Sequence, residues 1–271
     1  MTPPEEDAPN PRRHPSAGNL DSRPALVPEP EAAASVPSAA FPHGGGDVPR
    51  DGVALGPEVD PDLTTRLLGH IEGKRILELG CGTGELAITL ARGGAKVIAL
   101  DGSADHIAEA REAAEIAGVK VEFHHGDLAE LAFVRNEQID LAMSIFALGA
   151  VDDLDRVFRQ VHRVLRSEAT FVFSLPHPLT LMSELGEGDT SPRLVRTYFD
   201  RTSMAWSTET DVGAAYAHQI GDVVTSMARS NFRVDLVSEP RPVRDTTSVY
   251  WSDIAEWVPT TLIVRGRKVG T

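Results

Sequence analysis

The sequence predicts an α/β fold, in which a mostly parallel sheet of seven strands has helices on both faces and an inserted cap after strand five. Strand-like and helix-like segments alternate through five rounds up to residue 174, the pattern of a parallel sheet whose crossovers cover both faces. The pattern stops at about residues 175–217 and resumes with one helix and two strands. Ligands of such sheets bind beyond the carboxyl ends of the strands, so the irregular segment is interpreted as a cap that carries substrate contacts.

The composition indicates one domain with an extension. The chain has 271 residues, 41% of them hydrophobic, which is enough to bury one core. Residues 1–50 hold eleven of the 19 prolines and few large apolar side chains. We therefore predict a disordered tail over 1–50, with a strap over the active site as the alternative, and a single domain over 51–271.

Charge and hydropathy exclude several classes of partner. The formal net charge of −14 argues against nucleic acid, because binding to a polyphosphate depends on lysine and arginine. No signal-like start and no uninterrupted apolar run of about 18 residues is found, so we expect a cytoplasmic protein without a membrane partner. The single cysteine, Cys81, excludes a disulfide within the chain and is interpreted as a packing residue rather than a nucleophile. The oligomeric state stays unknown at this level.

Local patterns place each element. A helix begins at Asp60-Pro61, a capping residue followed by a proline in the first turn. The first strand covers Arg75–Leu79, and a glycine turn leads into a helix from Glu85 and a second strand over Lys96–Asp101. The remaining elements, predicted from apolar periodicity and capping residues, are helices over 103–118, 153–165 and 219–230 and strands over 119–125, 139–144, 170–174, 232–237 and 261–265.

The turn after the first strand indicates a nucleoside cofactor. It contains Gly80, Gly82 and Gly84, whose missing Cβ atoms let the backbone approach a ligand closely. The N–H groups at the start of the next helix suit a polar ligand tail, and Asp101 at the tip of the second strand can accept two ribose hydroxyls. A dinucleotide site wants Gly-x-Gly-x-x-Gly, whereas here the third glycine follows after a single residue.

The segment Glu78-Leu-Gly80-Cys-Gly82-Thr-Gly84 resembles the first motif of class I S-adenosylmethionine-dependent methyltransferases, which have a Rossmann-like fold. The resemblance continues in order and spacing over residues 74–174. It implies S-adenosyl-L-methionine as the cofactor, with Asp101 on its ribose and Asp127 on its adenine amino group. His106 stands where methionine or leucine often packs on the adenosine. The cofactor-binding residues implied by the resemblance are Glu78, Gly80, Cys81, Gly82, Gly84, Asp101, Gly102, His106, Gly126, Asp127, Leu128, Ser144 and Ile145.

Closer similarity is to bacterial small-molecule methyltransferases of the ubiquinone-biosynthesis-like (methyltransferase type 11) group. That group commonly carries a His-Pro after strand five, here His177-Pro178, a histidine before the late helix, here His218, and a Glu-Pro, here Glu239-Pro240. The resemblance implies an enzyme that methylates a small-molecule acceptor. His177 and His218 are the candidate catalytic residues, since a histidine pKa near about 6.5 suits a general base, and ordinary loop residues are the alternative interpretation.

The aromatic residues are distributed unevenly. All three tryptophans and all three tyrosines lie after residue 197, where they are expected to line a pocket for an apolar or aromatic acceptor or to pack a second small core. No carboxylate cluster follows the fourth strand, so no metal is expected. Two alternatives stay open, a regulatory S-adenosylmethionine-binding protein without transferase activity and an NAD-dependent oxidoreductase that the glycine spacing disfavours.

Overall fold

A computed structural model describes residues 54–56, 59–185, 188, 190–207, 212–241 and 253–270. The predicted tail over 1–50 lies outside these ranges, as do Tyr250, Trp251 and the side chain of Trp206, which belong to the predicted pocket aromatics. The disordered tail and its alternative, a strap over the active site, therefore stay predictions.

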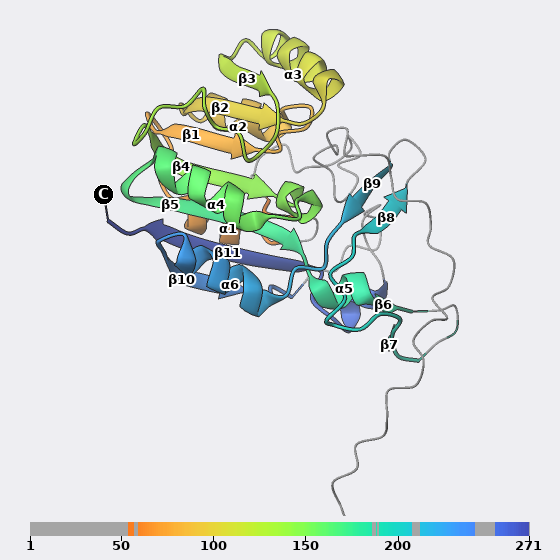
Figure 1. Ribbon diagram of the computed structural model, residues 1–271. Coiled ribbons are helices and arrows are strands. Elements are labelled where there is room, and N and C mark those ends of the chain that lie inside the picture. The colour runs from red at the N-terminus through yellow and green to blue at the C-terminus, as the bar shows by residue number, and fades with distance from the viewer. Residues whose placement is uncertain are drawn as a thin grey trace, which may run out of the picture. The chain divides into compact units, whose positions relative to one another are not determined.

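Seven strands form one sheet in the order β10-β11-β5-β4-β1-β2-β3, which confirms the predicted architecture (Figure 1). The neighbours from β5 to β3 pair in parallel, whereas β11 runs antiparallel to both β5 and β10. The strand order reverses between β1 and β4, the place where parallel sheets hold their ligands. The strands are β1 (Arg75–Leu79), β2 (Lys96–Asp101), β3 (Val121–His125), β4 (Ile139–Ile145), β5 (Leu165–Pro176), β10 (Phe232–Ser238) and β11 (Thr261–Lys268).

Helices cover both faces of the sheet. On one face α4 (Leu154–Val164) and α6 (Ile220–Arg229) pack side by side (Figure 1). The other face carries α1 (Pro61–Leu68), α2 (Glu85–Arg92) and α3 (Ala104–Ile116). Because apolar residues recur at helical spacing, each helix presents one apolar side to the sheet.

Alternate strand residues feed two apolar clusters, one on each face. On β1, Leu77 and Leu79 belong to the cluster beneath α4 and α6, while Ile76 belongs to the cluster beneath α1, α2 and α3. The period of two in a strand produces this division. Since both faces are buried, the central strands are almost continuously apolar, and a polar side chain within them stands out.

Three predicted boundaries are wrong. The last strand ends at Lys268 rather than at residue 265, because Lys268 still pairs with Phe232 of β10. The fifth strand begins at Leu165 rather than near residue 170, because Leu165 already pairs with Ile139 before a shift in register. The third strand begins at Val121 rather than at residue 119, because the Val119 N–H bonds back to the Ala114 carbonyl and closes the end of α3.

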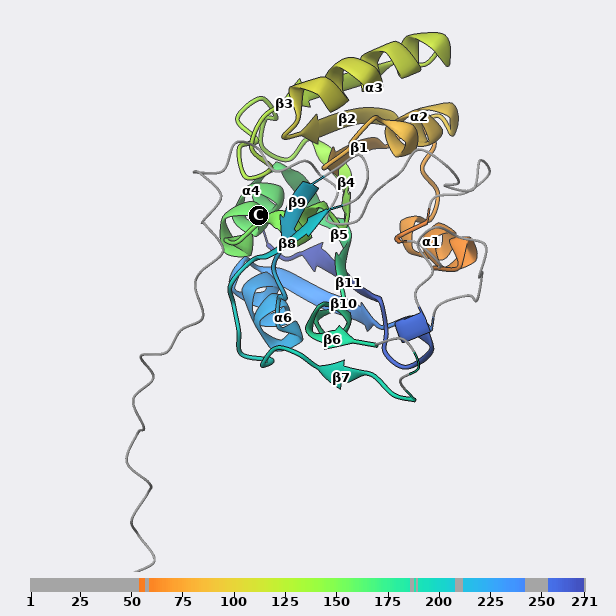
Figure 2. The same ribbon diagram turned by 90° about the vertical axis from the view of Figure 1, so that its right-hand side faces the viewer.

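The segment after β5 contains short elements at the carboxyl edge of the sheet (Figure 2). The Tyr216 N–H donates to the Gly149 carbonyl at 2.8 Å and so ties this segment to the end of β4. The extent of the cap, about 175–217, stays a prediction. The short elements of the chain are η1 (Ala147–Ala150), α5 (Pro178–Met182), the pair β6 (Ser183–Glu184) and β7 (Arg193–Leu194), the pair β8 (Met204–Ser207) and β9 (Val212–Ala215), and η2 (Asp253–Glu256).

Candidate functional site

The glycine turn joins β1 to α2 and folds back onto the end of β2. Gly80, Gly82 and Gly84 have φ angles of 76°, 51° and 84°, a backbone region that residues with a Cβ rarely adopt. The N–H groups of Gly80 and Cys81 both donate to the Leu100 carbonyl, at 2.7 and 3.1 Å. The local sequence therefore folds into a tight loop whose backbone is anchored to the neighbouring strand.

Asp101, the predicted ribose residue, lies at the end of β2 with a fully buried carboxylate. Its Oδ2 accepts the Gly82 N–H at 2.8 Å, and its Oδ1 accepts the Ser103 N–H at 2.8 Å. The Nδ1 of His106 lies 3.5 Å from Oδ1. Asp101 therefore holds the glycine loop in place at the end of β2.

A second buried carboxylate belongs to Glu78 on β1, which is 3% exposed. Its Oε2 has no hydrogen-bond partner in the described part of the chain. Burial, and then the negative charge of Asp101, raise the pKa of Glu78 well above the usual glutamate value. Burial and these two carboxylates also raise the pKa of the Cys81 thiol, which favours packing over nucleophilic chemistry for this residue.

The residues after β3 form the rim of the same region. The Gly126 N–H donates to the Asp101 carbonyl at 2.9 Å, so the ends of β2 and β3 are joined. Leu128 is buried. The Gly102 carbonyl lies 3.1 Å from Nε2 of His125, so this imidazole is engaged with the loop after β2.

Asp127, the predicted adenine residue, is half exposed at this rim. Its Oδ1 accepts the Ala129 N–H at 2.8 Å, which fixes the side chain. Its Oδ2 lies 3.4 Å from Nη1 of Arg156 on α4, and the same guanidinium reaches Glu130 at 2.9 Å. Asp127 is thus an accessible, oriented acceptor next to the buried loop.

Ser144 and Ile145 end β4 beside the glycine turn. Ser144 is fully buried, and its Oγ has no partner among the described residues, while Ile145 is partly buried. The next residue, Phe146, has a φ of 55° and is 1% exposed. Its N–H donates to the carbonyl oxygen of Ser174 at 3.1 Å and to the hydroxyl at 3.3 Å, so β4 and β5 are tied together at their carboxyl ends.

His177 follows the end of β5 and is 1% exposed. Its Nε2 lies 2.7 Å from Oε1 of Glu239, and its Nδ1 accepts the Leu179 N–H at 3.2 Å. Burial lowers the pKa of His177, and the hydrogen bond and charge of Glu239 oppose that shift. Since both ring nitrogens already have protein partners, this geometry favours a positioning role, and the catalytic role stays a prediction.

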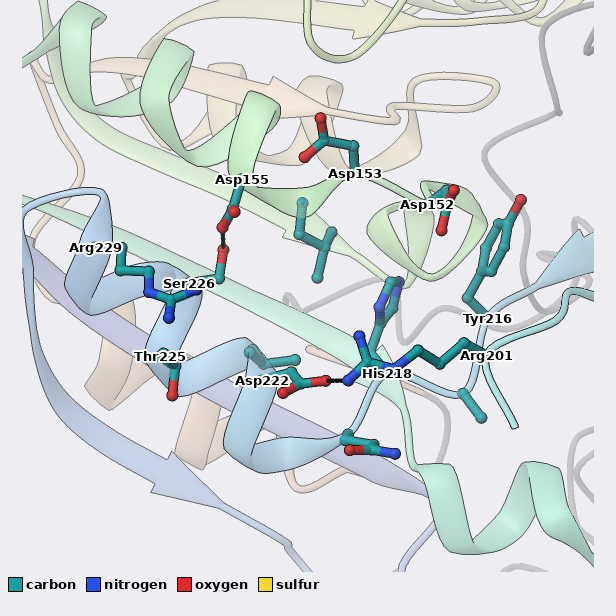
Figure 3. A pocket seen from close by; sticks show the side chains of 14 residues that line it. Asp152, Asp153, Asp155, Arg201, Tyr216, His218, Asp222, Thr225, Ser226 and Arg229 are labelled. Atoms are coloured by element: carbon teal, nitrogen blue, oxygen red, sulfur yellow. Dashed lines mark hydrogen bonds and ion pairs between the residues drawn. The ribbon is translucent and has the colours of Figure 1, made fainter. Parts of the chain in front are cut away.

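His218 precedes α6 and lines a separate cavity of about 240 Å³ between α4, α6 and the segment after β9 (Figure 3). Its Nε2 lies 2.9 Å from the Val151 carbonyl. Burial lowers the pKa of His218, and the Val151 carbonyl opposes that shift. Asp222 faces Arg201 in this cavity, and Asp155 bonds Ser226 (Figure 3). His218 and His177 therefore lie in different surroundings, and the catalytic role of His218 also stays a prediction.

The structure gathers the predicted residues from the ends of β1, β2, β3 and β4 along one edge of the sheet. It also places there residues that the sequence patterns did not single out, namely Ser174, Thr261 and Gly56. Ser174 and Thr261 carry hydroxyl groups near the ends of strands, and no spacing in the sequence distinguishes them from other polar residues. In the described ranges, no group of three or more His, Cys, Asp or Glu residues could hold a metal ion. None of the helices described there has the length and apolar character needed to cross a membrane.

Comparisons with known proteins agree with this geometry. Residues 76–168 match the family model described as a methyltransferase domain. The chain is 33% identical over 138 residues to the magnesium-protoporphyrin O-methyltransferase of Rhodobacter capsulatus, covering 50% of this chain and 60% of that one. It is 30% identical over 120 residues to a ubiquinone biosynthesis O-methyltransferase of Azorhizobium caulinodans, covering 42% and 47%. The chain spans about half the length of the curated relatives it matches.

Among solved structures, an S-adenosylmethionine-dependent methyltransferase from Mesorhizobium loti matches with a TM-score of 0.62 and 28% identity, over 76% of this chain and 96% of that one. The strand order, the glycine loop and these matches are those of the class I S-adenosylmethionine-dependent methyltransferases. Within that class, residues 76–168 match the methyltransferase-domain family. The predicted class and fold are thereby confirmed.

The residues present fit S-adenosylmethionine, the cofactor of this class. The buried Oε2 of Glu78 has no hydrogen-bond partner among the described residues. The cofactor carries ammonium and hydroxyl hydrogens that can pair with such an oxygen. Asp101 and Asp127 add one buried and one half-exposed carboxylate along the same edge. An acceptor-rich edge of this kind suits a ligand that is positively charged at its sulfonium.

Proposed function

We propose that this chain binds S-adenosylmethionine and transfers its methyl group to a small-molecule acceptor. The observation that carries the proposal is the position of Asp101, whose buried carboxylate accepts the Gly82 N–H at 2.8 Å and whose charge contributes to the raised pKa of the buried Glu78. The names of the two curated relatives, both O-methyltransferases of small molecules, support a small-molecule acceptor here.

The proposed cofactor contacts follow the edge of the sheet. The glycine loop and the first turn of α2 hold the polar tail, because their N–H groups and missing Cβ atoms allow close approach. Asp101 binds the ribose hydroxyls and Asp127 the adenine amino group, with His106 beside the adenosine. Ser144 and Ile145 lie at the end of β4, where the reacting end of the cofactor and the acceptor would meet.

The chemistry asks little of the protein beyond positioning. The bound cofactor supplies a methyl group that its sulfonium has already activated. The chain's part is to hold the acceptor in line at about 3 Å and to exclude water, and orientation of this kind provides most of the acceleration. Phe146, 1% exposed at the edge of the sheet, contributes to a dry site. A general base matters only for an acceptor that must first lose a proton.

Calorimetry with S-adenosylmethionine tests the proposal. The unmutated chain should bind, and Asp101→Asn should weaken binding at least about tenfold, because it removes a charge-assisted acceptor and loosens the loop. Glu109→Gln removes an exposed carboxylate from α3 and is the matched control, with unchanged affinity. Absence of binding to the unmutated chain would end the proposal, and tight NAD binding in its place would revive an oxidoreductase.

A second measurement separates an enzyme from a binding protein. Methyl transfer from S-adenosylmethionine should be detected with members of a panel of phenols, amines and thiols. If the cofactor binds but S-adenosylhomocysteine never accumulates with any acceptor, the regulatory alternative gains support.

A further inference from the structure

Phe146 adopts an unusual conformation for a large residue. Its φ of 55° lies in the left-handed region, which non-glycine residues rarely occupy. Two hydrogen bonds from its N–H to Ser174 hold the backbone there. Such strained residues cluster at functional sites, and this one stands at the carboxyl end of β4, on the ligand edge of the sheet.

Segments from distant parts of the chain meet at the ring of Phe146. The ring packs with Ala215 of β9 and with the partly buried Leu181 of α5, both in the segment after β5. From the N-terminal side, a Cβ built on Gly56 would lie 2.8 Å from Cζ of the ring. The ring therefore fills the space between the edge of the sheet and the segments that cover it.

The segment 54–56 lies against this ring. Leu55 is fully buried, and its N–H donates to the Oγ1 of Thr64 on α1 at 3.1 Å. Gly56 follows directly, and its missing Cβ allows the ring of Phe146 to approach the backbone. The backbone of Gly56 therefore packs closely against the ring of Phe146.

A buried hydroxyl without a partner lies beside the same point. The Oγ1 of Thr261, the first residue of β11, is 3.0 Å from the Cβ position of Gly56. Thr261 is fully buried, and its Oγ1 has no hydrogen-bond partner in the described ranges. Buried polar atoms are nearly always paired, so this hydroxyl points to a partner outside the described residues, such as a bound ligand.

We propose that the ring of Phe146 occupies the place of the acceptor's ring, and that Thr261 binds a hydroxyl group of that acceptor. Entry of the acceptor displaces the phenyl ring together with the segment 54–56, and the Thr261 Oγ1 then pairs with the ligand. A ring-sized apolar space next to one hydroxyl selects a planar aromatic molecule that carries a hydroxyl. The inference rests on the proposed function, whose acceptor class it names.

Binding of phenol and of benzene to the full chain, saturated with S-adenosylhomocysteine, tests the assignment. Phe146→Ala should bind phenol roughly tenfold more tightly than the unmutated chain, because an apolar cavity of ring size takes up aromatic molecules. The variant should also prefer phenol over benzene by about fivefold, the effect of one hydrogen bond. Adding Thr261→Val to Phe146→Ala should abolish that preference and leave benzene binding intact.

A cavity elsewhere provides the control. Phe158→Ala removes a fully buried ring of the same size beneath α4, away from the carboxyl edge, and should show no hydroxyl preference. If either alanine variant fails to fold, Phe146→Leu and Phe158→Leu give the same comparison with a smaller change. The inference is overturned if the Phe146 variant gains no affinity while S-adenosylhomocysteine still binds, or if Thr261→Val leaves the preference unchanged. Failure of S-adenosylhomocysteine to bind would instead contradict the proposed function.

Discussion

The imidazole of His177 is hydrogen bonded to the carboxylate of Glu239, with 2.7 Å between Nε2 and Oε1. This contact joins the end of β5 to the residue that follows β10, two strands away in the sheet. The Nδ1 of the same ring accepts the Leu179 N–H and caps the first turn of α5. One buried side chain thus fixes the start of the segment that covers the carboxyl edge.

Substitutions at His177 should separate its two contacts. His177→Asn keeps an acceptor for the Leu179 N–H but loses Glu239, whereas His177→Ala loses both. We expect the free energy of unfolding in urea to fall by about 1 kcal/mol for the first and by about 2 kcal/mol for the second. Equal losses in the two variants would show that the cap contributes nothing.

The same pair tests catalysis. As a positioning residue, His177 should be replaceable by asparagine with a kcat within about threefold of the unmutated chain, because in-line orientation is kept. If His177 is instead a general base, His177→Asn should lower kcat by a factor of about 100 or more. The kcat of the variant should also lose its dependence on pH below about 6.5. Turnover is measured with an acceptor found in the panel, while affinity for S-adenosylmethionine stays constant in either case.

Stability should depend on pH through three histidines that are at least partly buried. Burial lowers the pKa of His177, His218 and His162 in the folded chain, so below about 6.5 the unfolded chain binds more protons. The free energy of unfolding should therefore fall as the pH drops from 7.5 towards 5.5. Urea unfolding at several pH values should show a smaller slope for His177→Asn. The exposed control His70→Gln should leave the slope unchanged.

Glu78 should act in the opposite sense. Because its pKa is raised in the fold, the protonated form is favoured, and this contribution to stability is lost as the pH rises above about 4.5. Glu78→Gln keeps the shape without the charge. It should become more stable relative to the unmutated chain between pH 5 and pH 8, by about 1–3 kcal/mol, while binding S-adenosylmethionine more weakly. The exposed Glu72→Gln is the control, and parallel stability profiles for Glu78→Gln and the unmutated chain would contradict the prediction.

Gly84 should tolerate no side chain. A Cβ there would lie 2.9 Å from that of Ala110 and 3.1 Å from the ring of Phe123, in addition to the strain of a φ of 84°. Gly118→Ala, with a φ of 67° and nothing within 4 Å of the new Cβ, measures strain alone. We expect losses of about 1 kcal/mol for Gly118→Ala and of about 3 kcal/mol for Gly84→Ala in thermal or urea unfolding. Similar losses would mean that α2 can move away from α3.

Local patterns account for most of the fold. Period-two and helical alternation, with caps such as Asp60 and Ser103, predict every strand of the main sheet and five of its helices, because each depends on residues close in sequence. The spacing of Gly80, Gly82 and Gly84 likewise predicts the positive φ angles of a loop open to a ligand. The boundaries that differ, at the starts of β3 and β5 and at the end of β11, depend on a helix closure and on pairing with β4 and β10.

The surroundings of the candidate site were decided by the tertiary structure. No spacing in the sequence shows that the carboxylate of Glu239 is hydrogen bonded to the imidazole of His177. Nor does any spacing show that the ring of Phe146 and the hydroxyl of Thr261 both lie beside Gly56. These residues lie far apart in the sequence and come into contact only when the strands have assembled into the sheet. The sequence by itself determined the class of cofactor, since the pattern that indicates it, a short glycine loop and a strand-end acid, is local. The proposed surroundings of the acceptor depend on packing between distant segments, so they became visible only in the folded chain.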